Sequence, residues 1–102
     1  MMFQFSIAPT MTPNVEAEMA EIIADAVAVI RASGLPNETN AMSTTIEGEW
    51  DECMAVIKEA CEAVAKHSPR VSLFLKADIR EGMTNGLETK MVALEAALKA
   101  KG

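Results

Sequence analysis

The sequence predicts an α+β fold in which four strands and two helices follow the order β-α-β-β-α-β, with an added helix at the C-terminal end. Residues 3–8 and 70–80 alternate between apolar and polar side chains, which is typical of strands with one buried face. Residues 13–33 and 50–66 instead repeat their apolar side chains at helical spacing. This order is that of the ferredoxin-like sandwich, in which both helices cover one face of a four-stranded sheet.

Turn-forming residues limit the first strand and the first helix. The strand ends at Pro9, and helix 13–33 begins at Pro13, a residue that is favourable in the first turn of a helix. Gly34 follows this helix, and Pro36 prevents its continuation.

Two strand candidates lie between the helices. Residues 38–42 form a short polar candidate, and residues 43–49 form a stronger one because Thr44, Thr45 and Ile46 are β-branched. In this topology the first and third strands form the central pair, and the fourth lies beside the first. The second and fourth strands are then edges with unpaired backbone groups, which favours self-association.

The last strand and the last helix each have an apolar side. In strand 70–80 the odd-numbered residues are expected to face the core, namely Val71, Leu73, Leu75, Ala77 and Ile79. A loop is expected over residues 81–86. Helix 87–99 places four apolar residues on one side, namely Leu87, Met91, Leu94 and Leu98. This helix is a candidate for contact with a neighbouring chain.

Length and charge exclude several classes of protein. With 102 residues, the chain is expected to form one domain over residues 1–102. Its net charge of −6 repels phosphate backbones, so nucleic-acid binding is not expected. No apolar run reaches the ~18 residues of a membrane span, and residues 1–7 lack the Lys or Arg of a signal peptide. We therefore expect a cytoplasmic protein without a membrane partner.

The sequence contains no recognisable catalytic or metal-binding set. His67 is the single histidine and is expected to cap the end of helix 50–66. Cys53 and Cys61 are too far apart on one helix for a local disulfide, and we interpret them as small buried hydrophobic residues. The acidic residues of 47–52 suit a helix start better than a cation site. We expect no enzyme, no metal ion and no required cofactor.

The face of the sheet opposite the helices is the candidate binding surface. It is expected to be polar apart from Phe74, and an exposed Phe among hydroxyls and charges indicates cover by a ligand or a partner. The alternative is a polar face that is simply solvated. The expected residues of this open face are Gln4, Ser6, Ser43, Thr45, Glu47, Ser72, Phe74, Lys76 and Asp78.

The run Ser-Thr-Thr-Ile-Glu-Gly-Glu over residues 43–49 resembles the signature of the small thiamine-binding proteins related to YkoF. Shorter similarities flank it in the same order along nearly the whole chain. They comprise Ser6-Ile7-Ala8-Pro9, Ser33-Gly34-Leu35, Met42, Arg70-Val71, Lys76-Ala77-Asp78-Ile79-Arg80 and Leu87-Glu88-Thr89-Lys90.

The resemblance implies a ferredoxin-like fold in homodimers that pair into homotetramers. It also implies binding of thiamine, or of its hydroxymethylpyrimidine portion, without turnover. The ligand-binding candidates that it carries over are Ser6, Thr44, Thr45, Glu47 and Asp78, to which the open face adds Phe74.

Physical chemistry gives each candidate a possible role. The hydroxyls suit the donors and acceptors of an aminopyrimidine, and Phe74 suits stacking or cation–π contact with the thiazolium. Glu47 or Asp78 would balance the thiazolium charge. By alternation Thr44 points toward the helices, so either its backbone serves or the strand phase is shifted by one residue.

Two other functions compete with small-molecule binding. One is a regulatory or scaffold protein whose function is the oligomer and which has no small-molecule ligand. The other is an enzyme, which is the weakest because the sequence shows no pairing of a nucleophile with a base.

Overall fold

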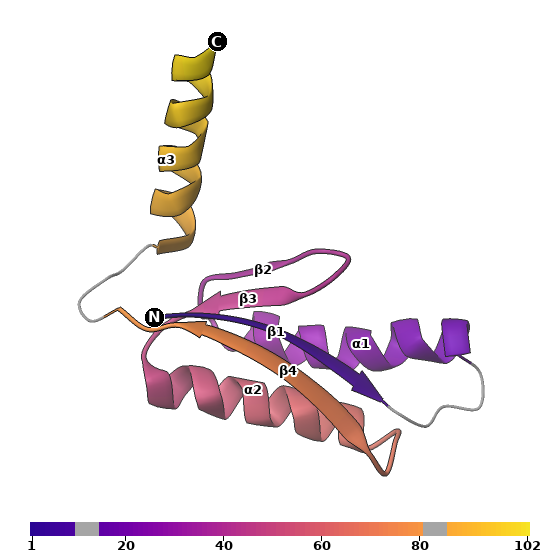
Figure 1. Ribbon diagram of the computed structural model, residues 1–102. Coiled ribbons are helices and arrows are strands. Elements are labelled where there is room, and N and C mark those ends of the chain that lie inside the picture. Colours follow the sequence, from indigo (N-terminus) through magenta and orange to yellow (C-terminus); the bar gives the residue numbers. More distant parts are fainter. Residues whose placement is uncertain (10–14, 81–85) are drawn as a thin grey trace.

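The computed structural model describes residues 1–9, 15–80 and 86–102, and it has the predicted α+β architecture (Figure 1). The elements are β1 (Met2–Pro9), α1 (Val15–Ala32), β2 (Asn37–Thr39), β3 (Thr44–Glu47), α2 (Trp50–Ala65), β4 (Val71–Asp78) and α3 (Gly86–Lys101). The strands form one sheet in the order β2-β3-β1-β4, with antiparallel pairing throughout. The predicted central pair and the predicted edges are confirmed. The loop expected over 81–86 lies largely outside the described residues.

Helices α1 and α2 pack side by side against one face of the sheet (Figure 1). The core between these layers includes Phe3, Phe5, Ile30, Ile46 and Val64, each with at most 2% of its surface exposed. Burial of one such aliphatic or aromatic side chain contributes about 1.5–3 kcal/mol. Because Phe3 and Phe5 alternate with exposed Gln4 and Ser6, β1 has one buried face, as the sequence predicts.

A capping box starts α2 directly after β3. The backbone N–H of Glu49 donates to Glu52 Oε1 at 2.8 Å, and the Glu49 side chain accepts in return from the backbone N–H of Glu52. A Cβ at position 48 would lie 2.5 Å from Glu52 Oε1 and 3.1 Å from Cys53 Sγ. Gly48 therefore leaves room for the side chains of Glu52 and Cys53 at the turn from β3 into α2.

The side chain of His67 joins the two helices, contrary to the cap that was expected. Its Nε2 lies 2.9 Å from Asp25 Oδ2 of α1, while its backbone N–H donates to the Val64 carbonyl. Cys53 is fully buried and Cys61 is partly buried, and both are free thiols. Burial is the main cause that raises the pKa of Cys53 to about 11, so this thiol behaves as a small hydrophobic side chain.

Strand β4 departs from its predicted burial. Leu73 and Leu75 lie opposite Ile7 and Phe5 and therefore share the helix side of the sheet. They nevertheless remain 43% and 37% exposed, and Ile79 is 62% exposed. The prediction of core-buried residues along β4 is therefore wrong. The reason is that β4 is an edge strand, with a neighbour on one side only.

Helix α3 stands away from the body of the molecule (Figure 1). Its predicted apolar stripe is not buried, since Met91, Leu94 and Leu98 are each at least 50% exposed. Among the described residues, no helix is long and apolar enough to cross a membrane.

Candidate ligand-binding site

Strand β3 divides the predicted binding residues between the two faces of the sheet. Thr44 pairs with Phe5, so its side chain points toward the helices and is 7% exposed. Thr45 pairs with Gln4 on the open face. The orientation of Thr44 that alternation predicts is thus confirmed, and the two threonines line separate cavities.

The first cavity lies on the helix side of the sheet, between α1, the β2–β3 hairpin and the end of β1. Its volume is about 200 Å³. Apolar side chains make most of its wall, namely Phe5, Ile7, Ile23, Ala26, Val27 and Ile30. Its polar lining comes from Ser6 of β1 and from the hairpin, namely Thr39, Asn40, Ser43 and Thr44. We call it the helix-side cavity.

Hydrogen bonds within the hairpin fix this polar lining. The hydroxyls of Thr39 and Thr44 lie 3.1 Å apart. Oδ1 of Asn40 accepts from the backbone N–H groups of Met42 and Ser43 at 2.8 and 3.0 Å, which shapes the tip of the hairpin. With Oδ1 engaged in the turn, Nδ2 is the hydrogen-bond donor of the Asn40 side chain.

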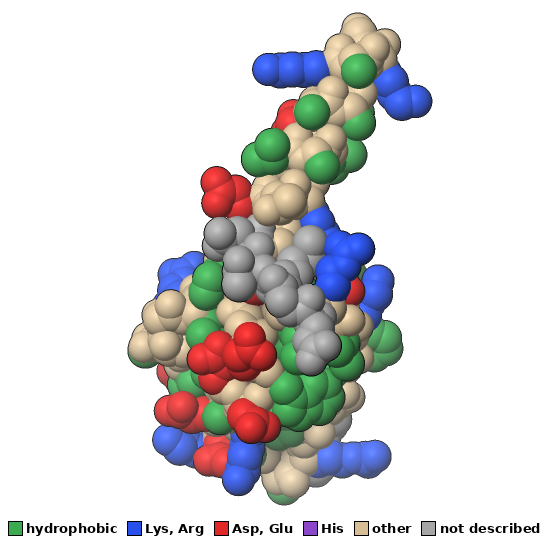
Figure 2. Space-filling model, turned by 90° about the vertical axis from the view of Figure 1, so that its left-hand side faces the viewer, with side chains coloured by type: hydrophobic (Ala, Val, Ile, Leu, Met, Phe, Trp, Pro, Cys, Tyr) green, Lys and Arg blue, Asp and Glu red, His purple; other side chains and the backbone are tan. Residues whose placement is uncertain are grey.

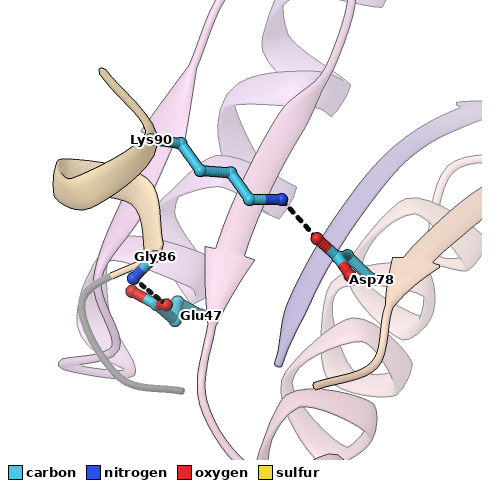
Figure 3. A network of polar contacts seen from close by, with 4 residues as sticks. All are labelled: Glu47, Asp78, Gly86 and Lys90. Atoms are coloured by element: carbon cyan, nitrogen blue, oxygen red, sulfur yellow. Dashed lines mark hydrogen bonds and ion pairs between the residues drawn. The ribbon is translucent and has the colours of Figure 1, made fainter. Parts of the chain in front are cut away.

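The second cavity lies on the open face, where Gln4 and Thr45 meet β4. Its volume is about 400 Å³, and its other lining residues are Met2, Lys76, Ala77, Asp78 and Lys90. We call it the open-face basin. Lys90 of α3 forms an ion pair with Asp78 at its edge (Figure 3). The hydrogen bond from Lys90 and then its positive charge hold the pKa of Asp78 below its ordinary value.

Glu47 is buried on the open face and holds the first residue of α3. Its carboxylate accepts a hydrogen bond from the backbone N–H of Gly86 (Figure 3). A Cβ at position 86 would lie 2.7 Å from Glu47 Oε2 and 2.9 Å from Met2 Sδ, so any larger residue there would have to displace the ends of these two side chains. Both carboxylates that the sequence offers to a thiazolium are thus engaged with α3.

The structure therefore brings only four of the six predicted residues together, in two pairs, and Glu47 and Phe74 line neither cavity. Ser6 and Thr44 line the helix-side cavity, and Thr45 and Asp78 line the open-face basin. Phe74 lies opposite Ser6 across the β1–β4 pairing and is 74% exposed, outside both cavities.

Three polar lining residues are absent from the set that the sequence predicts. Thr39 and Asn40 reach the helix-side cavity through the hairpin, and Lys90 reaches the open-face basin from α3. Asn40 lies inside the strand candidate 38–42, whereas β2 ends at Thr39; an Asn at the start of a tight turn is the local signal for this part of the lining. Outside residues 10–14 and 81–85, no three His, Cys, Asp or Glu side chains are placed to hold a metal ion together.

Comparison with known proteins gives a consistent assignment. Residues 3–95 match the model of the family described as thiamine-binding protein. The UPF0045 protein Mb1933 of Mycobacterium bovis is 45% identical over 95 residues, which cover 92% of this chain and 90% of the relative. The UPF0045 protein MJ1052 of Methanocaldococcus jannaschii is 36% identical over 78 residues, covering 76% of this chain and 78% of the relative.

Solved structures show the same fold. The crystal structure of MJ1052 superposes with a TM-score of 0.78 at 33% identity, over 92% of this chain and 94% of that one. A candidate thiamine biosynthesis and salvage protein of Thermotoga maritima has a TM-score of 0.73 at 24% identity, over 89% and 96% of the two chains. The resemblance found in residues 43–49 and their flanks is thus confirmed, and the chain belongs to the thiamine-binding protein family.

Proposed function

We propose that this protein binds thiamine or its hydroxymethylpyrimidine portion without catalysing a reaction, and that the helix-side cavity takes the pyrimidine ring. The observation that carries the proposal is the lining of this cavity. An apolar wall that includes Phe5 faces a set of uncharged polar groups from Thr39, Asn40 and Thr44. A mostly apolar cavity with a few placed polar groups is the usual form of a small-molecule site.

The polar groups match the chemistry of an aminopyrimidine. Its ring nitrogens accept hydrogen bonds, and its amino group donates them. The Thr44 hydroxyl can do both, and the Asn40 Nδ2 group can donate. A lining without charged groups also suits a neutral ring, because an unpaired buried charge next to it would be costly.

The size of the cavity favours one ring over the whole ligand. Its volume of about 200 Å³ is below the roughly 300–1,000 Å³ of sites for drug-sized molecules. The pyrimidine would therefore be enclosed, and the thiazolium of thiamine would lie near the mouth beside Met42, which is 84% exposed. The net charge of −6 would attract that cation at long range.

We also propose that the protein works as a homodimer that pairs into a homotetramer in the cytoplasm. Strand β4 is an edge strand with exposed apolar side chains, and such an edge favours pairing with another chain. The free thiols of Cys53 and Cys61 are in keeping with a reducing compartment.

Isothermal titration calorimetry with thiamine and with hydroxymethylpyrimidine tests the ligand. Thr44→Val removes the hydroxyl from the helix-side cavity and keeps the β-branched shape. Thr45→Val makes the same change one residue away on the open face and is the matched control. We expect saturable binding that Thr44→Val weakens at least about tenfold, the value of one lost hydrogen bond to the ligand, and that Thr45→Val leaves unchanged.

Two other results would contradict the proposed site or the proposed ligand. Loss of binding in Thr45→Val alone would move the site to the open-face basin. No heat with either ligand, from folded protein, would exclude thiamine-type binding and favour the scaffold function, for which the exposed helix α3 is the supporting observation.

A further inference from the structure

Strand β1 is longer than the part of it that pairs with β3. The pairing of β1 with β3 ends at Phe5 and Thr44, whereas the pairing with β4 continues to Pro9. On the β3 side, the remaining residues of β1 therefore lie beyond the last residue pair. The helix-side cavity lies at this place, because its lining includes Phe5, Ser6 and Ile7 of β1 together with the tip of the hairpin.

Alternation along β1 directs the backbone of Ile7 toward this cavity. The Met1 carbonyl accepts a hydrogen bond from the backbone N–H of Gly48, which continues the register of β1 with β3 by one pair. Because the backbone groups of successive strand residues point to opposite sides, those of the odd-numbered residues face β3 and those of the even-numbered residues face β4. The N–H and the C=O of Ile7 thus both point to the side where β3 has ended.

Two residues near Ile7 support this direction. By the same register Met42 would pair with Ile7, but it lies in the turn of the hairpin and is 84% exposed. Pro9 has no backbone N–H, and a proline within a strand is placed so that this position faces away from a paired strand. Pro9 pairs with Val71 of β4, so its ring nitrogen lies on the same side of β1 as the backbone groups of Ile7.

The polar groups that face this cavity are neutral. Figure 2 shows acidic and basic side chains over the outer surface of the molecule, whereas the described lining of the helix-side cavity consists of uncharged residues. In such a lining, backbone N–H and C=O groups are strong and directional hydrogen-bonding groups. Their position is fixed, because Ile7 pairs with Leu73 of β4 and its side chain is buried in the core.

We propose that the pyrimidine ring of the ligand takes the place beside Ile7 that a further residue of β3 would occupy. A ring nitrogen accepts a hydrogen bond from the N–H of Ile7, and the amino group on the adjacent ring carbon donates one to its C=O. These are the two hydrogen bonds that a paired strand residue would make. The inference rests on the proposed binding of thiamine or hydroxymethylpyrimidine, and it names the backbone of Ile7 as the group that orients the ring.

This contact defines the class of ligand. The ring must carry a hydrogen-bond acceptor next to a donor, so that it can pair with an N–H and a C=O of one residue. It must also be flat and apolar on the side that meets α1, because Ile23, Ala26 and Val27 line the cavity there. An aminopyrimidine meets both conditions.

Amide hydrogen exchange of the free protein, followed by NMR, tests the direction of the Ile7 backbone. The N–H of Phe5 faces β3 and that of Ala8 faces β4, so both are paired within the sheet. We expect the N–H of Ile7 to exchange at least about tenfold faster than either of them. Equal protection at the three positions would mean that the N–H of Ile7 is already bonded within the protein, which would overturn the proposal.

The same measurement with saturating hydroxymethylpyrimidine tests the contact itself. We expect exchange at Ile7 to slow at least about tenfold more than exchange at Phe5 and Ala8. These two positions correct for the general stabilisation of the folded state by a bound ligand. An analogue that lacks the amino group leaves the C=O of Ile7 unpaired, so calorimetry should show at least about tenfold weaker binding.

The outcomes distinguish this contact from the proposed function. Saturable binding without a change in exchange at Ile7, or equal affinity of the analogue, would refute the contact and retain the binding function. Absence of binding by both thiamine and hydroxymethylpyrimidine would exclude the proposed function and this contact with it.

Discussion

The carboxylate of Glu47 accepts a hydrogen bond from the backbone N–H of Gly86, and this contact ties the end of β3 to the start of α3. Glu47 is 5% exposed and lies within the motif that the sequence offers as a ligand-binding signature. The contact gives this residue a positioning role that does not require a ligand.

Two substitutions of Glu47 should show whether its hydrogen bond or its charge contributes to the stability of the protein. Glu47→Gln keeps an oxygen acceptor for the Gly86 N–H, so its free energy of unfolding should stay close to that of the wild type. Glu47→Ala leaves the buried N–H unpaired and should lower the free energy of unfolding by about 1–3 kcal/mol. Urea unfolding measures both values, and amide exchange at residues 86–90 shows whether α3 has detached. Equal stability of the two variants would mean that the contact does not hold α3.

The ion pair between Asp78 and Lys90 should make the attachment of α3 to the sheet depend on pH. The hydrogen bond and charge of Lys90 lower the pKa of Asp78 in the folded protein from its ordinary 3.8. The pair therefore stabilises the attachment above pH 3.8, and this contribution is lost as the pH falls through the lower, folded pKa. An NMR titration of the Asp78 carboxyl carbon should show a midpoint below 3.8. In Lys90→Gln the midpoint should move back up, and a midpoint unaffected by this change would refute the pairing.

The buried thiol of Cys53 should be inert in the folded protein. Its pKa of about 11 leaves almost no thiolate at pH 8, and the side chain is fully buried. Burial also raises the pKa of Cys61, although this residue is only partly buried. A thiol-specific reagent at pH 8 should label Cys61 slowly and Cys53 only after unfolding. Because the folded pKa of Cys53 exceeds the ordinary 9.0, the free energy of unfolding should fall as the pH rises from 9 to 11. In Cys53→Ala this fall should be smaller.

Two phenylalanines on β1 and β4 should differ sharply in their effect on stability. Phe5 is 2% exposed in the core, and Phe5→Ala should lower the free energy of unfolding by about 3–5 kcal/mol. Phe74 is 74% exposed, and Phe74→Ala should change the stability of the isolated chain by less than about 0.5 kcal/mol. Chemical denaturation at low protein concentration compares them. A large loss in Phe74→Ala under those conditions would show that this side chain is packed within its own subunit.

The sequence alone determined the elements and their order. Alternation along β1 and the β-branched run in β3 are local properties, because successive side chains of a strand point to opposite faces. The same rule correctly placed Thr44 on the helix side and Thr45 on the open face. The topology then followed from the right-handed connections of two such units, which left β2 and β4 as edges.

Only the tertiary structure decided which residues pack against each face of the strands and helices. Leu73 and Leu75 have the pattern of core residues but lie on an edge strand, so burial depended on neighbours that sequence spacing does not specify. The β2–β3 hairpin places Thr39 and Asn40 in the wall of the helix-side cavity, and α3 places Lys90 beside Asp78. A repeat of side chains along one element fixes the direction of each side chain relative to that element. Which partner lies in that direction depends on contacts between residues far apart in the chain, and those exist only once the chain has folded.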